Sequence, residues 1–178
     1  MEERKSVFKR GAECGLPMGL YMSVMTLATL YSDKASLLSL LFLVMLLMGP
    51  VVIYRFQRQY FLQEHGMTEY SALWMLGILM VIYGALISGA VTLVVLQWLR
   101  PTLLYDQAQQ FLDLCKATPD MQAQFGTFVD VVQKMVDENL LPKPIDTVFS
   151  TFWFVAFSGS MLSAITAAFA NRAIKNQY

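Results

Sequence analysis

The sequence has 178 residues, of which 56% are hydrophobic and only 15% are charged. Its mean hydropathy is +0.49. Soluble domains carry roughly 25% charged residues, so this composition argues against a soluble globular protein and predicts an integral membrane protein.

Four windows of the sequence are long and apolar enough to cross a bilayer, which takes about 20 helical residues at 1.5 Å each. They cover residues 11–31, 36–54, 70–98 and 147–170. Hydrocarbon offers no partner for backbone polar groups, and the alternating pattern of barrel strands is absent, so we expect all four spans to be helices. The prediction is an all-α membrane protein in which residues 1–178 form a single integral membrane domain.

The basic residues that precede the first window, among them Lys9 and Arg10, could belong to a signal peptide. However, the apolar run is too long for one, and no small-residue cleavage site follows it before "YSDKAS". We therefore interpret residues 11–31 as a retained anchor.

Lysine and arginine are distributed unequally between the two sides that four spans would create. With a cytoplasmic N-terminus, eight of them lie inside and five outside, as the positive-inside rule favours. The inner set is Arg4, Lys5, Lys9, Arg10, Arg55, Arg58, Arg172 and Lys175, and the outer set is Lys34, Arg100, Lys116, Lys134 and Lys143. Both termini are therefore predicted to be cytoplasmic.

The three connections between the spans differ. "SDKA" predicts a tight outer turn, whereas residues 55–69 predict a basic inner loop with Arg55 and Arg58 at the lipid headgroups. Within that loop Gly66 indicates a helix break and Thr68 a new N-cap. Residues 99–145 form the one sizeable outer insert.

The insert predicts an amphipathic helical hairpin between spans three and four. Apolar residues recur at helical spacing before and after "TPD", where Thr118 is the expected N-cap and Pro119 the first helical residue. We expect the hairpin to fold over the outer ends of the spans; the alternative is that it binds a partner or lipid. Its few basic residues argue against nucleic acid or anionic lipid. The stripes are Leu104, Ala108, Phe111, Leu112 and Cys115, then Met121, Phe125, Phe128, Val129, Val132 and Val136.

Small residues recur every four positions in three of the spans. Such rows let helices approach closely, either within one copy or between this chain and a second copy or a different membrane protein. The helix-packing candidates are Gly11, Gly15, Gly19, Gly84, Ser88, Gly159 and Ser163.

Glu13 is the one ionisable residue well inside the predicted spans. An intramembrane charge is costly and suggests function, but Lys9 and Arg10 lie four and three residues before it, where a helical ion pair forms. Glu13 is thus either paired structurally or a coupling acid. Pro17 and Pro50 are candidate kinks because each removes a backbone hydrogen bond.

Catalytic patterns are missing from the sequence. His65 is the sole histidine, and no phosphate-binding loop, nucleophile elbow or Cys-x-x-Cys motif occurs. We expect neither an enzyme nor a metal or cofactor site. Cys14 and Cys115 are predicted on opposite sides of the bilayer, which excludes a disulfide between them, and Cys115 is predicted to be a buried free thiol.

The order of these parts resembles the family catalogued as domain of unknown function 4199, small bacterial inner-membrane proteins found mainly in Bacteroidetes. The matching features are the basic start running into "GLPMGLYMS", the inner "QEHGMTEYSALWMLGILMVIYGALISG", the acidic outer insert and the final "AAFANRAIK". The resemblance implies a four-span layout in a bacterial inner membrane and no chemistry. Small multidrug exporters are a weaker resemblance: their first-helix carboxylate would correspond to Glu13, but this chain departs from them in its long insert and in the shallow position of Glu13.

Two functions follow as hypotheses. The first is a non-enzymatic accessory or scaffold subunit that packs with another membrane protein through its small-residue faces. The second is a small homo-oligomeric transporter or lipid-handling protein with Glu13 as coupling acid.

Overall fold

The computed structural model describes residues 7–32, 35–63, 68–138 and 140–175, and over these residues the chain contains helices and no strand. Its elements are α1 (Val7–Leu30), α2 (Ser36–Gln63), α3 (Tyr70–Val94), a π-helical turn η1 (Val95–Leu99), α4 (Leu103–Ala117), α5 (Pro119–Asp137) and α6 (Pro144–Lys175). Contacts divide the chain into two compact units, and we describe each by itself. We call Met1–Thr92 with Phe149–Tyr178 the bundle unit and Leu93–Val148 the insert unit.

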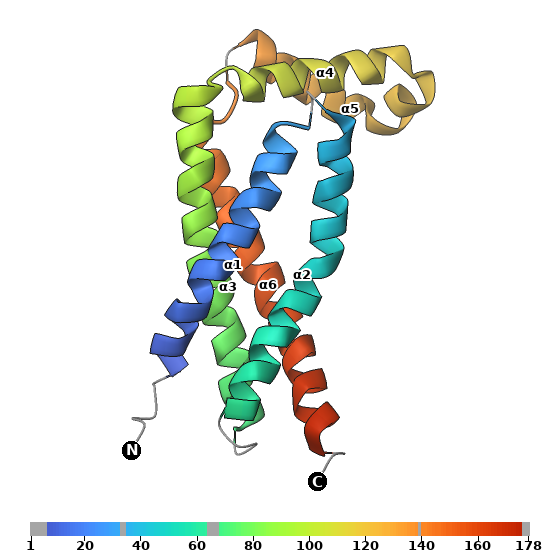
Figure 1. The fold of residues 1–178 in the computed structure, drawn as a ribbon. Coiled ribbons are helices and arrows are strands. Elements are labelled where there is room, and N and C mark those ends of the chain that lie inside the picture. The colour runs from blue at the N-terminus through green and yellow to red at the C-terminus, as the bar shows by residue number, and fades with distance from the viewer. Residues whose placement is uncertain (1–6, 33–34, 64–67, 139, 176–178) are drawn as a thin grey trace. The chain divides into compact units, whose positions relative to one another are not determined.

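The bundle unit contains α1, α2 and most of α3 and α6. Figure 1 shows that α1 and α3 run in one direction and α2 and α6 in the opposite one. Among the described residues, three helical segments are long and apolar enough to cross a membrane, namely Leu37–Gln63, Tyr70–Leu99 and Pro144–Arg172. The start of α1 carries Lys9, Arg10 and Glu13, which lower its apolar content.

The second helix is longer than predicted. α2 continues to Gln63, so the prediction of an inner loop from residue 55 is wrong. Ile53, Gln57 and Tyr60 recur every three or four residues and are buried, which means that one face of the helix still packs inside the unit. Arg55 and Arg58 lie on the exposed face of α2. Charge had ended the apolar window before the helix itself ended.

The connections are described only in part. Residues 33 and 34 of the predicted outer turn and Gly66 of the predicted break lie outside the described residues. The predicted N-cap at Thr68 is wrong: α3 begins at Tyr70, and Leu73 N–H donates to the Glu69 carbonyl (3.3 Å). The Thr68 hydroxyl is buried and has no hydrogen-bond partner in the part of the chain that the structure describes.

The glycine row of α1 packs against α3. A Cβ added to Gly11 would lie 2.7 Å from the Cβ of Leu79, one on Gly15 2.5 Å from that of Tyr83, and one on Gly19 2.8 Å from that of Ile87. Real Cβ atoms essentially never come closer than 3.0 Å to such neighbours. Because each contact pairs residues 68 positions apart, the two helices run parallel and in register. Glycine is therefore what permits this separation of the two backbones.

The next interface, between α3 and α6, is antiparallel and polar. Gly77 lies against Ser163, and Gly159 lies against the Val81 side chain. Near them the Trp74 indole donates to the Ser160 carbonyl (3.2 Å) and the Tyr70 hydroxyl to the Ala164 carbonyl (3.1 Å). Aromatic side chains of α3 thus reach over the small residues of α6 and bind its backbone.

Gln57 connects three helices in the interior of the bundle unit. Its side chain, on α2, is 0% exposed. The amide nitrogen donates to the Leu73 carbonyl of α3 (3.2 Å) and to the carbonyl and hydroxyl oxygens of Ser163 on α6 (both 3.1 Å). The Gln57 carbonyl oxygen has no hydrogen-bond partner among the described residues. Because acceptors surround the nitrogen, the side chain acts as a donor only.

In the insert unit, α4 and α5 pack on each other around Leu112, Cys115, Val129 and Val136. α5 begins at Pro119 directly after Thr118, as predicted, although the Thr118 hydroxyl makes no capping hydrogen bond. Cys115 is 0% exposed and unbonded to another cysteine, which confirms the predicted buried free thiol. Two amphipathic helices therefore supply this unit with its own core.

We predict that Gly15→Ala destabilises the protein by about 1–3 kcal/mol, since its methyl group would overlap the Tyr83 Cβ, which is fixed to the α3 backbone. Thermal unfolding in mild detergent measures the change. Gly126→Ala in α5 is the control: no heavy atom lies within 4 Å of its added Cβ, so the better helix former should stabilise by about 0.5–1 kcal/mol. Equal effects of the two changes would contradict the close α1–α3 contact.

We also predict that Gln57→Glu is far more damaging than Gln57→Met. The glutamate would place a carboxyl group against the carbonyls of Leu73 and Ser163, so it would stay charged without a partner or take up a proton, and either costs several kcal/mol at neutral pH. Methionine fills a similar volume, and its loss of the donor costs about 1 kcal/mol. Detergent unfolding midpoints of the two variants measure this difference, and similar midpoints would refute the donor-only role of Gln57.

Candidate functional site

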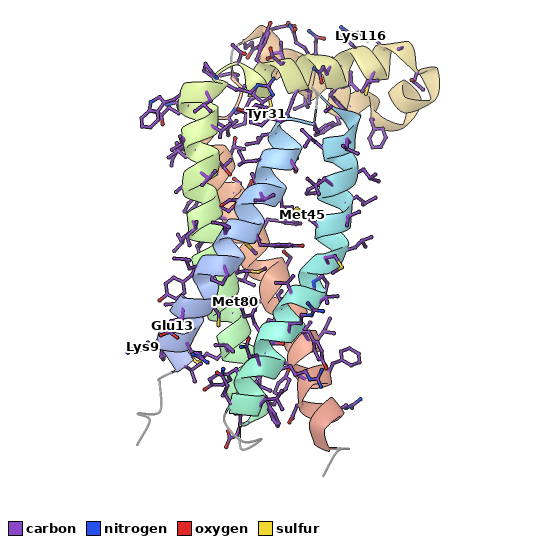
Figure 2. All side chains as sticks on the ribbon, in the orientation of Figure 1. Lys9, Glu13, Tyr31, Met45, Met80 and Lys116 are labelled. Atoms are coloured by element: carbon purple, nitrogen blue, oxygen red, sulfur yellow. The ribbon has the colours of Figure 1, made fainter. Side chains whose placement is uncertain are left out.

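Glu13 forms an ion pair on the first turns of α1. Its carboxylate oxygen Oε2 lies 3.2 Å from the Arg10 guanidinium nitrogen Nη1, three residues earlier. The two side chains are 39% and 24% exposed, so the pair is worth at most about 1 kcal/mol. Figure 2 shows Glu13 and Lys9 at this end of α1. The structure thus contains the ion pair with Arg10 that the spacing predicts, and a role of Glu13 as coupling acid stays a prediction.

The extension of α2 completes a small polar cavity around this pair. The cavity has a volume of about 210 Å³ and receives three residues from α1 and four from α2. Its lining is Arg10, Glu13, Cys14, Phe56, Gln59, Tyr60 and Gln63. A cation, an anion, two amides and a phenol line one space, so it can hold a small polar group by hydrogen bonds and charge.

Of the residues around this cavity, the sequence pattern indicates Arg10, Glu13 and Cys14 on α1 but not those on α2. The loop predicted over residues 55–69 gives no reason to place Gln59, Tyr60 and Gln63 on a face shared with Glu13. The available signal was the spacing of Phe56, Gln59 and Gln63, which is three and four residues and thus helical.

The remaining candidate residues lie elsewhere in the bundle unit. Gly84 packs against the side chains of Met18 and Met22, and the Ser88 hydroxyl lies 2.9 Å from that of Thr26. With the contacts of Gly11, Gly15, Gly19, Gly159 and Ser163 given above, all seven small residues touch a neighbouring helix of the same copy. The small-residue rows are therefore occupied within the unit.

The two prolines lie inside helices, Pro17 in α1 and Pro50 in α2. In Figure 1 the ribbon of α2 changes direction about halfway along its length, which is where Gly49 and Pro50 fall in the sequence. A proline there removes one backbone hydrogen bond and favours such a bend.

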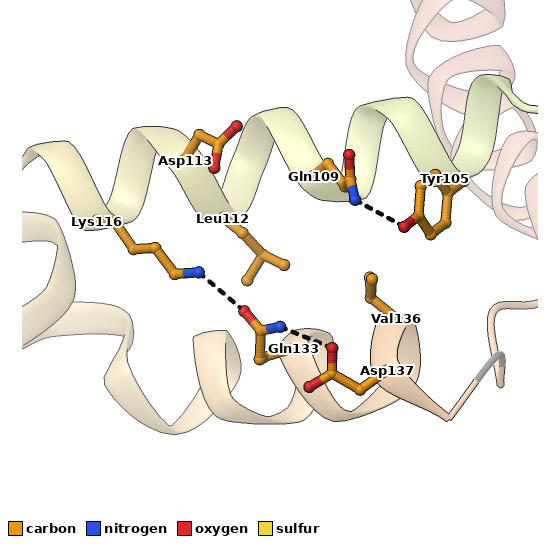
Figure 3. A pocket seen from close by; sticks show the side chains of 8 residues that line it. All are labelled: Tyr105, Gln109, Leu112, Asp113, Lys116, Gln133, Val136 and Asp137. Atoms are coloured by element: carbon orange, nitrogen blue, oxygen red, sulfur yellow. Dashed lines mark hydrogen bonds between the residues drawn. The ribbon is translucent and has the colours of Figure 1, made fainter.

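The insert unit has a separate polar trough between α4 and α5 (Figure 3), with a volume of about 450 Å³. Lys116 Nζ donates to the Gln133 side-chain oxygen (3.1 Å), and the Gln133 amide nitrogen donates to Asp137 (3.0 Å). At the other end Gln109 donates to the Tyr105 hydroxyl (2.7 Å). Leu112 and Val136 are the buried apolar residues in its lining. Its polar groups largely satisfy one another.

No group of three or more His, Cys, Asp or Glu residues that could hold a metal ion occurs in the described ranges. His65 lies outside them. The free thiols belong to different places: Cys14 is half-buried at the cavity with Glu13, and Cys115 lies in the core of the insert unit.

We predict that N-ethylmaleimide modifies Cys14 and spares Cys115 in the folded protein, because the Cys115 thiol has no exposed surface. Intact-mass spectrometry should find one adduct before denaturation and two afterwards. The Cys14→Ala variant, which should take no label while folded, is the control. Rapid labelling of Cys115 in that variant would show that the core of the insert unit opens.

No curated protein and no solved structure shows a significant match to this chain. The family described as protein of unknown function (DUF4199) matches residues 13–172, which is nearly the whole chain and includes all of the insert unit and most of the bundle unit. The chain therefore belongs to the DUF4199 family of proteins of unknown function.

Proposed function

We propose that this protein is a four-span accessory or scaffold subunit of a membrane assembly in the bacterial inner membrane, without enzymatic activity. Three helices have the length and apolar composition of membrane spans. α1 is the fourth span in this proposal: its 24 residues extend about 36 Å, and its glycine row lies against α3. In this arrangement α4 and α5 form a hairpin outside the bilayer.

The distribution of basic residues supports cytoplasmic termini. Arg10 at the start of α1 and Arg55 and Arg58 near the end of α2 belong to the inner group of eight, against five outside. The start of α1 and the end of α2 lie at the same end of the bundle unit in Figure 1. One cytoplasmic face would thus collect these positive charges.

The first half of α2 carries the proposal of a scaffold role. From Leu37 to Met48 every described side chain is exposed except Leu38, Phe42 and Met45, which are half-buried and recur at intervals of four and three. Only this narrow stripe faces the protein, where the Tyr21 hydroxyl donates to the Met45 carbonyl. The open sides are long, apolar and uncharged, so they can contact lipid or another membrane helix, and in this proposal a second copy or a different membrane protein covers them.

A second candidate function rests on the cavity beside Glu13. A carboxylate that shares a small polar space with Arg10, Gln59 and Gln63 could couple proton movement to the transport of a small polar or lipid-derived molecule. In this alternative the protein works as a homo-oligomer, and Pro17 and Pro50 provide bends near the path.

Photo-crosslinking in native membranes tests the scaffold role. A photoreactive residue replaces Leu43 or Leu47 on α2, or Phe157 on α6 as an equally apolar and exposed control. We expect discrete protein adducts from α2 and lipid adducts alone from Phe157, and adduct mass distinguishes a second copy from another protein. Lipid adducts alone from both α2 positions would refute the scaffold proposal.

Glu13→Gln separates the two candidate functions. In the scaffold proposal this change leaves both the α2 adducts and the phenotype of the producing cells unchanged, since the ion pair is half-exposed and weak. Loss of a proton-linked transport or resistance phenotype, with the adducts retained, would instead support the transporter.

A further inference from the structure

The two helices of the insert unit have a polar face and an apolar face besides the core that joins them. The core residues of α5, namely Val129, Val132 and Val136, recur at intervals of three and four. Successive residues are 100° apart around a helix, so Gln133 and Asp137 lie to one side of this core stripe. They belong to the trough that α5 shares with Lys116 and Gln109 of α4 (Figure 3).

On the other side of the core stripe α5 has a second apolar stripe. Phe128, Val131 and Met135 recur at intervals of three and four and are 57%, 45% and 38% exposed. By the same helical geometry Asp130 and Lys134 lie on the far side of the helix. This stripe is more apolar surface than the α4–α5 contact needs.

α4 extends this apolar surface. The rings of Phe111 and Phe128 meet edge to face with centroids 5.6 Å apart, and Leu114, one helical turn after Phe111, is 61% exposed. We call Phe111, Leu114, Phe128, Val131 and Met135 the apolar face of the insert unit. It spans both helices, so it is a broad surface rather than a single row.

Short connections join the helices of the insert unit to the two apolar segments that flank them. Three residues connect η1, which ends at Leu99, to α4, and six connect α5 to α6. Three extended residues reach at most about 10 Å. The segments on both sides, Tyr70–Leu99 and Pro144–Arg172, are long and apolar enough to cross a bilayer. A lipid surface is therefore within reach of the insert unit from both ends.

We propose that the apolar face lies in the boundary between headgroups and acyl chains of the adjacent lipid leaflet, with the trough toward water. Residues 103–138 contain six acidic and two basic residues, so apolar burial rather than attraction to anionic lipid drives this contact, and a zwitterionic surface suits it best. The inference rests on the proposed membrane embedding, because the flanking spans bring the insert unit to the bilayer.

Site-specific fluorescence tests this contact with the full-length Cys14→Ala protein in phosphatidylcholine nanodiscs. Phe128→Cys and Met135→Cys place an environment-sensitive label on the apolar face, and Gln109→Cys places it on the trough as the matched control. Leu43→Cys on α2 reports on membrane embedding itself. Cys115 is buried and escapes the label. Lipids with a nitroxide near the headgroup or deeper in the acyl chain serve as quenchers.

We expect headgroup-level nitroxides to reduce the fluorescence at Phe128→Cys and Met135→Cys by about half or more while Gln109→Cys stays nearly unquenched. Salt at about 1 M, where charges are screened beyond about 3 Å, should not change this. Quenching at Leu43→Cys by deep nitroxides, with both apolar-face positions no more quenched than Gln109→Cys, would overturn the inference and leave the embedding intact. No quenching at any position would overturn the proposed embedding as well.

Discussion

The close approach of α1 to α3 is the constraint on which the rest of the bundle unit depends. At Gly11, Gly15 and Gly19 the neighbouring helix occupies the space where a side chain would begin, so even alanine would force the two backbones apart. The contact holds α1, the helix with charges in its first turns, against residues 79–88 of the apolar helix α3. It also leaves Arg10, Glu13 and Cys14 to face α2, which is how the polar cavity forms. The glycine row of α1 and the position of the candidate acid Glu13 thus depend on the same contact between α1 and α3.

The two halves of α2, before and after Pro50, have different surroundings, and the buried amide of Gln57 lies in the second half. After Pro50 the helix is held by hydrogen bonds to α3 and α6 and by the burial of Ile53, Tyr60 and Phe61. Before Pro50 only one narrow stripe faces the protein. A buried donor that finds several acceptors fixes the position of a helix, whereas uniform apolar contact does not. The proposed scaffold role follows from this difference, because the half before Pro50 has few contacts within the protein and keeps most of its apolar surface exposed.

The insert unit likewise has one surface whose polar groups are hydrogen-bonded to one another and another surface that is apolar and exposed. Its trough is polar, and Lys116, Gln133 and Asp137 bind one another there, whereas Phe128, Val131 and Met135 remain exposed. A soluble helix pair would gain little from such a face, since exposed apolar area is costly in water. Next to segments long and apolar enough to cross a membrane, the same area suits the lipid contact that we propose. The acidic character of these helices then restricts the kind of lipid surface that suits them.

The sequence by itself determined the all-helical class, the presence of long apolar helices, the amphipathic helices between residues 99 and 145 and the burial of Cys115, because composition and periodicity act within single segments. Only the tertiary structure decided that α1 pairs with α3 in parallel, that α2 continues to Gln63, and that Gln59 and Gln63 share a cavity with Glu13. A small-residue row shows that a helix can be approached closely, but not by which helix. The hydropathy averaged along the chain falls at charged residues such as Arg55 and Arg58, so the predicted span ends there. The helix continues because one of its faces is still buried. Which residues meet depends on faces from distant segments, and no pattern within one segment contains that information.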